Sequence, residues 1–268
     1  MAESGIGARR ACERLIEDGR VRVNGSIVRD LPIFVDSTDR IDVNGRPVLA
    51  PDRLLYVMLN KPARTLTTAA DEPGADRRTV VDLVQHPSGH RLFPVGRLDY
   101  DTVGLILMTN DGALANRMTH PSYGLPKTYR ATVRGTLHDE DVQKLQKGIY
   151  LAERKEGRTT GAARTEPVSI EVIRRARDRT LLEITLHEGR NRQVRRMLAE
   201  AGCPVKKLER IAMGPLRLKG LARGEWRELT RAELTVLRKA VPKKPKSKVS
   251  RKSKVSKKGQ SRVRPRNS

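Results

Sequence analysis

Asp99 is the residue whose surroundings best suit chemistry, because a cation and a hydroxyl group stand close to it in the sequence. Arg97 precedes it by two residues and Thr102 follows it by three. The apolar run Leu105–Met108 comes next and stops at the turn signal Asn110–Gly112, which predicts a buried strand directly after the aspartate. A carboxylate at the mouth of a strand, beside an arginine, is placed to be ionised and presented to a ligand.

An arginine-rich segment further along the chain holds a second group of candidates. A helix is predicted from about Asn191 to Ala201, with Gly202 as its stop. At about 100° per residue its apolar face consists of Val194, Met197, Leu198 and Ala201. Arg195 flanks this face, whereas Arg192 and Arg196 point nearly opposite it. We therefore expect Arg195 to be partly buried against a carboxylate, and the other two to face phosphates.

The first 47 residues are predicted to form a compact basic module. A short helix is expected at Arg9–Asp18, where Gly19 stops it. The segments Val21–Val23 and Ile41–Val43 are predicted strands, and each is followed by Asn-Gly, a strong signal for a hairpin turn. Residues 48–53, which include Pro51, are predicted to be a linker.

From Leu54 to about Thr235, predicted strands and helices mix without strict alternation. This favours an α+β fold with a mixed, mainly antiparallel sheet over a doubly wound one. The predicted strands are Leu54–Leu59, Leu105–Met108, Tyr129–Val133, Val168–Ile173, Leu181–Leu186 and Val205–Leu208. The predicted helices are Asp111–Thr119, Asp139–Lys147, Asn191–Ala201 and Arg231–Val241.

The charge of the chain points to a polyanionic partner. The 268 residues carry a formal net charge of +24, and the pI is about 10.8. From Val236 to Ser268 there are 14 basic and no acidic residues, and the preceding chain still has 41 basic against 31 acidic ones. Residues 242–268 lack hydrophobic periodicity, so we predict a disordered tail that binds phosphates without sequence specificity.

Membrane proteins, secreted proteins and metalloproteins are disfavoured. No apolar run approaches the ~20 residues that span a bilayer, and the N-terminus lacks a signal pattern, so a cytoplasmic protein is expected. Cys12 and Cys203 lie far apart in a chain without a secretion signal, so we expect reduced thiols in a cytosol. No Cys-x-x-Cys spacing occurs, and no metal site is expected.

Several of these segments resemble motifs of the pseudouridine synthases, enzymes that isomerise uridine within RNA. The segment Gly96–Gly112 closely resembles their signature, and Lys127–Tyr129 resembles the second motif. Glu188–Leu198 is similar to the third motif as it occurs in the branch that acts on ribosomal RNA. Asn60–Pro62 resembles a motif that opens the catalytic domain, although Ala63-Arg64 replaces the usual x-Gly; we expect a structural role for it.

The resemblance implies a role for each matched residue. Asp99 is the implied nucleophile and Arg195 the arginine that pairs with it. Tyr129 is expected to pack on the flipped base and is a candidate for moving the C5 proton. Attack of Asp99 on the base, attack on the sugar, and assistance to elimination all remain open. No metal or redox cofactor is implied. The expected RNA contacts are Arg9, Arg10, Arg97, Lys127, Arg190, Arg192 and Arg196.

The resemblance also implies a domain organisation. The helix and Gly-Arg-Val-x-Val-Asn-Gly segment of the first module resemble the S4-like RNA-binding domain, with a shortened first helix that indicates a trimmed module or a misassigned start. We expect this domain at residues 1–47, a linker at 48–53, the catalytic domain at 54–241 and the tail at 242–268.

The basic tail and the segment Leu221–Trp226 look most like the large-subunit enzymes of this branch. The implied partner is therefore 23S rRNA or a pre-ribosomal particle, bound by a monomer. Three alternatives remain: a 16S rRNA target, a noncatalytic RNA-binding assembly protein, and a nucleic-acid-binding regulator driven by charge alone.

Overall fold

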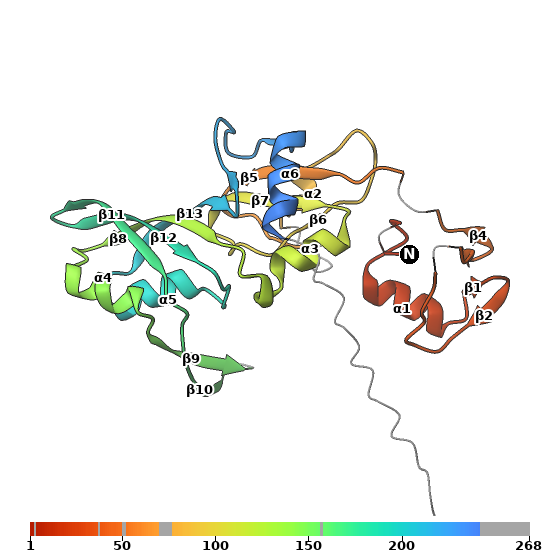
Figure 1. Ribbon diagram of the computed structural model, residues 1–268, viewed down its shortest axis with the longest axis horizontal. Helices are drawn as coiled ribbons and strands as arrows, with labels where there is room; N and C mark the ends of the chain where they lie inside the picture. The colour runs from red at the N-terminus through yellow and green to blue at the C-terminus, as the bar shows by residue number, and fades with distance from the viewer. Residues whose placement is uncertain (3, 37, 50–51, 70–76, 156–157, 242–268) are drawn as a thin grey trace, which may run out of the picture.

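The computed structural model describes residues 1–241, apart from residues 3, 37, 50–51, 70–76 and 156–157 (Figure 1). The predicted tail at 242–268 and part of the predicted linker at 48–53 therefore lie outside the described residues. Within the described part, no helix is both long and apolar enough to cross a membrane.

The N-terminal module consists of helix α1 (Arg9–Glu17) and a small antiparallel sheet in the order β2-β1-β3-β4. Asn24 and Asn44 adopt φ angles of 52° and 51°, and the glycine after each also has positive φ. These are the predicted Asn-Gly hairpin turns, and they join β1 to β2 and β3 to β4. The strands are β1 (Val21–Val23), β2 (Ser26–Val28), β3 (Ile41–Val43) and β4 (Arg46–Pro47).

A larger sheet of nine strands organises the rest of the described chain, with the central order β11-β12-β8-β13-β7-β5-β15. Among the described strands, every pairing is antiparallel except that of β13 with β7, which confirms the expected α+β fold with a mainly antiparallel sheet. The strands are β5 (Tyr56–Lys61), β6 (Phe93–Pro94), β7 (Val103–Thr109), β8 (Lys127–Arg134), β11 (Ser169–Ala176), β12 (Arg179–Leu186), β13 (Val205–Met213), β14 (Leu216–Arg217) and β15 (Trp226–Glu228).

The helices of this part begin with local capping signals. Asp111 accepts a hydrogen bond from Leu114 N (2.8 Å) at the start of α3, and Thr230 with Glu233 forms a capping box at α6. The helices are α2 (Val80–Leu83), α3 (Gly112–Thr119), the 3-10 helix η1 (Pro121–Tyr123), α4 (Asp139–Gln146), α5 (Gln193–Glu200) and α6 (Arg231–Ala240).

The parallel contact between β13 and β7 joins two halves of the sheet. It consists of the pairs Glu209↔Val103 and Arg210↔Gly104. Gly104 has φ +106°, and a Cβ there would lie 2.8 Å from the Arg210 nitrogen and closer still to its carbonyl oxygen. A side chain at this position would push the strands apart, so the glycine permits the junction. The loop that carries Asp99 leads directly into it.

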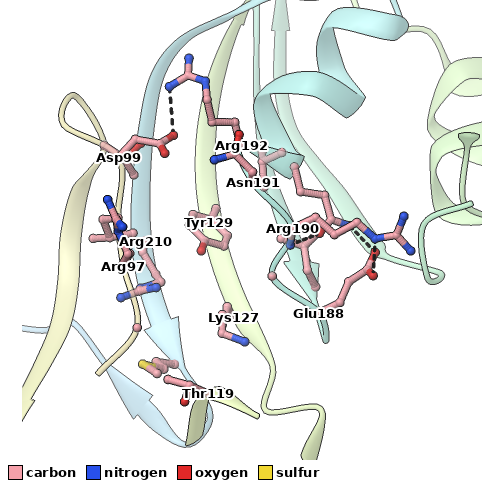
Figure 2. A pocket seen from close by; sticks show the side chains of 18 of the residues that line it. Arg97, Asp99, Thr119, Lys127, Tyr129, Glu188, Arg190, Asn191, Arg192 and Arg210 are labelled. Atoms are coloured by element: carbon pink, nitrogen blue, oxygen red, sulfur yellow. Dashed lines mark hydrogen bonds and ion pairs between the residues drawn. The ribbon is translucent and has the colours of Figure 1, made fainter. Parts of the chain in front are cut away.

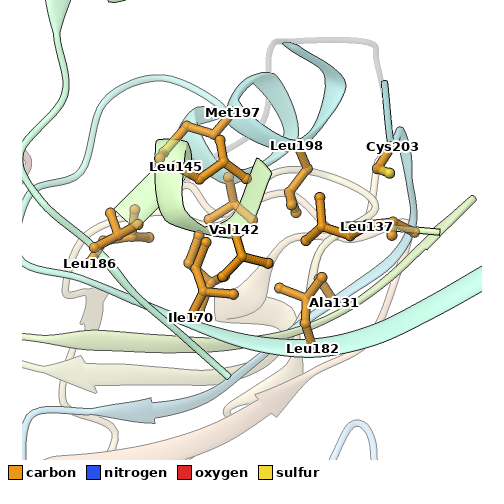
Figure 3. Close-up of a cluster of buried hydrophobic side chains, with 14 of the residues drawn as sticks. Ala131, Leu137, Val142, Leu145, Ile170, Leu182, Leu186, Met197, Leu198 and Cys203 are labelled. Carbon is orange, nitrogen blue, oxygen red and sulfur yellow. The ribbon is translucent and has the colours of Figure 1, made fainter. Parts of the chain in front are cut away.

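Hydrophobic cores lie on both sides of this junction. In one half, α4 and α5 pack on β8, β11 and β12, with Leu182, Ile184 and Leu198 among the buried residues (Figure 3). In the other half, all seven residues of β7 are buried because both faces of the strand are covered. One face packs with α3 and α6, and the other with α2. The contact between β13 and β7 therefore lies between two closely packed hydrophobic cores.

The structure corrects the bounds of two predicted elements and adds others that were not predicted, among them α2, β15 and a hairpin. Helix α5 begins at Gln193 rather than near Asn191, and β13 continues to Met213, five residues beyond the predicted end. The hairpin of β9 (Tyr150–Lys155) and β10 (Arg158–Arg164) had not been predicted. It projects from the α4–α5 half of the fold (Figure 1), and the described residues of β10 are largely exposed, so no alternation of apolar residues marks it in the sequence.

Candidate active site

Asp99 lies in the loop between β6 and β7, at the border of a pocket of about 720 Å³. Its carbonyl accepts a hydrogen bond from Thr102 N (3.1 Å), which closes the turn. The carboxylate is 29% exposed, and two arginines approach it: Arg192 Nη1 at 3.3 Å and Arg195 Nε at 3.6 Å from Oδ2. Both arginines therefore place positive charge beside this carboxylate.

Arg195 is the more buried of the two arginines. Its side chain is 15% exposed and also donates from Nη2 to the Thr102 hydroxyl (3.2 Å), so it bridges two positions of the same loop. Burial and the nearby Arg192 lower the pKa of the guanidinium. The structure thus places Arg195 beside the carboxylate, on the flank of the apolar face of α5, while its catalytic role stays a prediction.

Arg192 corrects the expectation that came from the helical wheel. It is the N-cap of α5, with φ +49°, and not a residue of the helix itself. Its side chain therefore turns toward Asp99 (Figure 2), although it was expected to point away from the helix's buried face. The side chain is 52% exposed, which leaves part of the guanidinium accessible to a phosphate.

Lys61 binds the backbone of the loop that carries Asp99. It is fully buried at the end of β5, and its ammonium donates to the carbonyls of Tyr100 (3.1 Å) and Thr102 (2.9 Å) as well as to its own neighbour Pro62 (3.0 Å). Burial lowers the pKa of Lys61 to about 8, against the opposing influence of Asp101 and Asp99. The structural role expected for this motif is therefore specific: it fixes the loop that presents the carboxylate.

Tyr129 and Lys127 extend from β8 along another wall of the pocket (Figure 2). The tyrosine is half-buried and packs against the core clusters of both halves of the sheet. The Lys127 ammonium donates to Leu125 O (3.2 Å), and burial, together with the charge of Arg210, lowers its pKa. Arg97 is exposed at the pocket and, among the described residues, forms no ion pair.

Arg190 and Arg196, both expected to bind RNA, hold the β9–β10 hairpin against α5. Arg190 pairs with Glu188 (2.8 Å) and donates to the carbonyls of Ala163 (3.2 Å) and Arg164 (2.6 Å) in β10. Arg196 donates to Ala152 O in β9. Each arginine thus donates hydrogen bonds to groups within the protein, and its contact with RNA stays a prediction.

Arg9 and Arg10 lie outside this pocket. Both are exposed at the start of α1 in the N-terminal module. Their expected contact with RNA would therefore be made by that module and not by the pocket around Asp99, and it too stays a prediction.

Arg210 was not among the residues expected from the sequence, yet it lines the pocket from β13 with only 2% of its surface exposed. It stands in the alternation Leu208, Arg210, Ala212, whose three members are buried. An arginine at an inward position of an alternating strand was the available signal, because buried charges are rare outside functional or paired sites.

In the described chain, no group of three His, Cys, Asp or Glu side chains could hold a metal ion.

A carboxylate held by cations in a pocket with an aromatic wall suits an enzyme whose substrate is a polyanion, and comparison with known proteins identifies the class. The profile of the RNA pseudouridylate synthase family matches residues 55–200, a range that includes Asp99, Tyr129 and Arg195. The S4 domain profile matches residues 1–41. The chain belongs to the RNA pseudouridylate synthase family, and it is an isomerase that acts on RNA.

Individual relatives are similar to this chain over most of its length. An RNA pseudouridine synthase of Aquifex aeolicus is 45% identical over 242 residues, which are 90% of this chain and 92% of the relative. The ribosomal large subunit pseudouridine synthase B of Bacillus subtilis is 41% identical and covers 89% of this chain and 93% of its own length. A crystal structure of a pseudouridylate synthase superposes with a TM-score of 0.62 at 29% identity, and covers 88% of this chain and 96% of that one.

Proposed function

We propose that this enzyme converts one uridine of 23S ribosomal RNA to pseudouridine, with Asp99 as the nucleophile. The observation that carries the mechanism is the Asp99 carboxylate, which lies within 3.6 Å of two arginines at a pocket lined by Tyr129. The choice of target is supported by the 41% identity to the large-subunit enzyme of Bacillus subtilis. A net charge of +24 and the S4 domain match support a large RNA partner.

The reacting bond is inaccessible inside a stacked RNA helix, so the enzyme has to extrude the nucleotide. The pocket of about 720 Å³ is large enough for a nucleotide, and the Tyr129 side chain on its wall offers a surface on which the base can stack. Arg97 is exposed two residues before Asp99, where it can fill the gap left by the base or contact its neighbours. We propose these two roles for Tyr129 and Arg97.

The isomerisation breaks the bond between N1 and C1′, turns the base, and joins C5 to C1′. The proton on C5 leaves in the last stage, and Tyr129 is our candidate for moving it. Asp99 can attack C1′, attack the base, or assist elimination at the sugar; each route uses the ionised carboxylate. Arg195, which is mostly buried, would keep the carboxylate aligned through the loop.

The test is pseudouridine mapping of ribosomal RNA from cells that lack this protein, complemented with the wild type or with Asp99→Asn. We expect one 23S site to disappear and to return only with the wild type. A lost 16S site would keep the chemistry and refute the proposed target. Rescue by Asp99→Asn would refute the proposed nucleophile, provided that both proteins accumulate to the same level and bind the RNA equally.

A further inference from the structure

Arg210 occupies a central position that the mechanism above does not use. Its backbone pairs with Tyr129 of β8 on one side and with Gly104 of β7 on the other. It therefore sits where the two halves of the sheet meet, between the strand of the tyrosine and the strand that follows Asp99. Figure 2 shows Arg210 close to Arg97, between the Asp99 loop and the strand that carries Tyr129.

The guanidinium of Arg210 is held at one end and unpaired at the other. Its Nε donates to Leu105 O (2.7 Å), a carbonyl of β7 just past the parallel contact. Its Nη2 is buried and has no hydrogen-bond partner, and within the described residues no carboxylate forms an ion pair with the side chain. A buried, unsatisfied donor on a charged group is strongly unfavourable, so its retention at the pocket wall calls for an acceptor.

Two lysines near Arg210 add to the positive charge around its guanidinium. Lys61 and Lys127 are close enough that the charge of Arg210 contributes to lowering the pKa of both ammonium groups, in addition to burial. Asp99 and Asp101, in the loop that Lys61 contacts, have the opposite effect and raise the pKa of Lys61. Of the two lysines, Lys127 lines the pocket together with Arg210, and both would stabilise negative charge on a group that enters.

We propose that Arg210 donates a hydrogen bond to a carbonyl oxygen of the extruded uracil and stabilises the negative charge that develops on the ring. This rests on the proposed function. When the bond between N1 and C1′ breaks heterolytically, its electron pair stays on the uracil and spreads from N1 to O2 and O4. The electron-poor C1′ is left facing the carboxylate of Asp99. C5 of this anion then forms the bond to C1′ with an electron pair of the ring. Loss of the C5 proton and protonation of N1 complete pseudouridine, so no external electron donor is needed.

A donor aimed at this oxygen acts mainly in the transition state, because the neutral uracil accepts a weaker hydrogen bond than its anion. Loss of one such donor typically slows an enzyme by about 100-fold to 1,000-fold. A guanidinium that merely fills the space between β7 and β13 would affect folding and not the chemical step. A guanidinium that bound a phosphate would change affinity for RNA and its dependence on salt.

The experiment measures single-turnover rates, RNA affinity and melting temperature for the wild type, Arg210→Met and Arg210→Lys. Arg130→Met serves as a control, because Arg130 is a half-exposed arginine on the neighbouring strand β8 that pairs with Glu183 (2.8 Å). The substrate is an RNA stem-loop with the mapped target uridine. We expect Arg210→Met to lose about 100-fold or more in rate, with less than about a twofold change in affinity. Arg130→Met should match the wild type.

A second measurement has a wild-type arm that does not depend on how well the Arg210 variants fold. Stem-loops with 2-thiouridine or 4-thiouridine at the target carry a weaker acceptor at one position, and one of them should react more slowly with the wild type. That penalty should shrink in Arg210→Lys. Equal wild-type rates on all three substrates, or an affinity loss without a rate loss, would overturn the proposal. Failure of the proposed function is recognised separately, because wild type and Asp99→Asn would then show the same activity on the unmodified stem-loop.

Discussion

At the scale of single residues, the site depends on how one carboxylate is held. Asp99 has an exposed arginine and a mostly buried arginine as partners, and their contributions should differ. An exposed ion pair is screened by water and contributes about 0–1 kcal/mol, whereas removal of one partner from a buried pair costs about 3–5 kcal/mol. Arg192 is 52% exposed and Arg195 is 15% exposed, so the two can be separated by experiment.

We expect Arg195→Met to lower the single-turnover rate constant at least about 100-fold, and Arg192→Met at most about fivefold. The reason is that Arg195 also holds Thr102, so its loss frees the loop as well as the charge. Rates measured at saturating enzyme separate this effect from RNA binding. Equal losses in the two variants would contradict the assignment of the buried arginine as the main partner.

Lys61 predicts a pH dependence of stability. Its pKa is about 8 in the folded protein and 10.5 in its ordinary state. Between these values the unfolded chain binds more protons, so the free energy of unfolding contributed by this group rises with pH. Relative to Lys61→Met, the wild type should gain at most about 3 kcal/mol between pH 7.5 and pH 10.5. Urea unfolding of both proteins at the two pH values measures this, and a constant difference would refute it.

At the scale of elements, the decisive feature is the short parallel contact between β13 and β7. The two halves of the sheet have their own cores, and this contact fixes the distance between the Asp99 loop and Tyr129. The absence of a side chain at Gly104 makes the contact possible. A disturbance here should therefore reach both stability and catalysis.

Gly104→Ala should destabilise the protein by at least about 2 kcal/mol more than Gly224→Ala. Both glycines have positive φ, +106° and +88°, but nothing lies within 4 Å of a Cβ at Gly224, so the difference isolates the clash with β13. Chemical denaturation supplies the free energies, and turnover should fall in parallel in Gly104→Ala. Similar values for the two variants would mean that backbone strain, and not the approach of the strands, accounts for the glycine.

At the scale of the whole molecule, positive charge gathers in the C-terminal segment. Residues 242–268 hold 12 basic and no acidic residues. We propose that this segment adds affinity for any RNA without contributing to the choice of uridine, since a charged segment contacts phosphates and not base edges.

Removal of residues 242–268 should weaken RNA binding at low salt and make the logarithm of the affinity fall less steeply with the logarithm of salt concentration, by about 0.7–0.9 for each phosphate that the segment neutralises. The single-turnover rate at saturating enzyme should not change, because the truncation leaves the pocket intact. Titrations at several salt concentrations provide the slopes. An unchanged slope would exclude binding of phosphates by this segment.

Much of the fold was accessible from local patterns. The Asn-Gly turns, the Asp111 cap and the apolar run of β7 each signal their structure within a few residues, and the structure has all three. The β9–β10 hairpin was missed because its exposed residues carry no apolar alternation. Arg192 was assigned to the helix because the predicted helix starts too early; in the structure it is the N-cap residue, with φ +49°, and it pairs with Asp99.

The sequence by itself determined the class of the protein, since the matched motifs and the excess of basic residues are properties of residue type and spacing. The resemblance already implied that Arg195 pairs with Asp99, but only the tertiary structure showed that Arg192 also reaches it and that Arg210 lines the same pocket. Arg192 and Arg195 reach this loop from about 90 residues away, and Arg210 reaches Leu105 across 105 residues. No local pattern couples segments so far apart. Their contact is set by the junction of β13 with β7, and that junction exists because two separately packed halves of the sheet meet at a glycine.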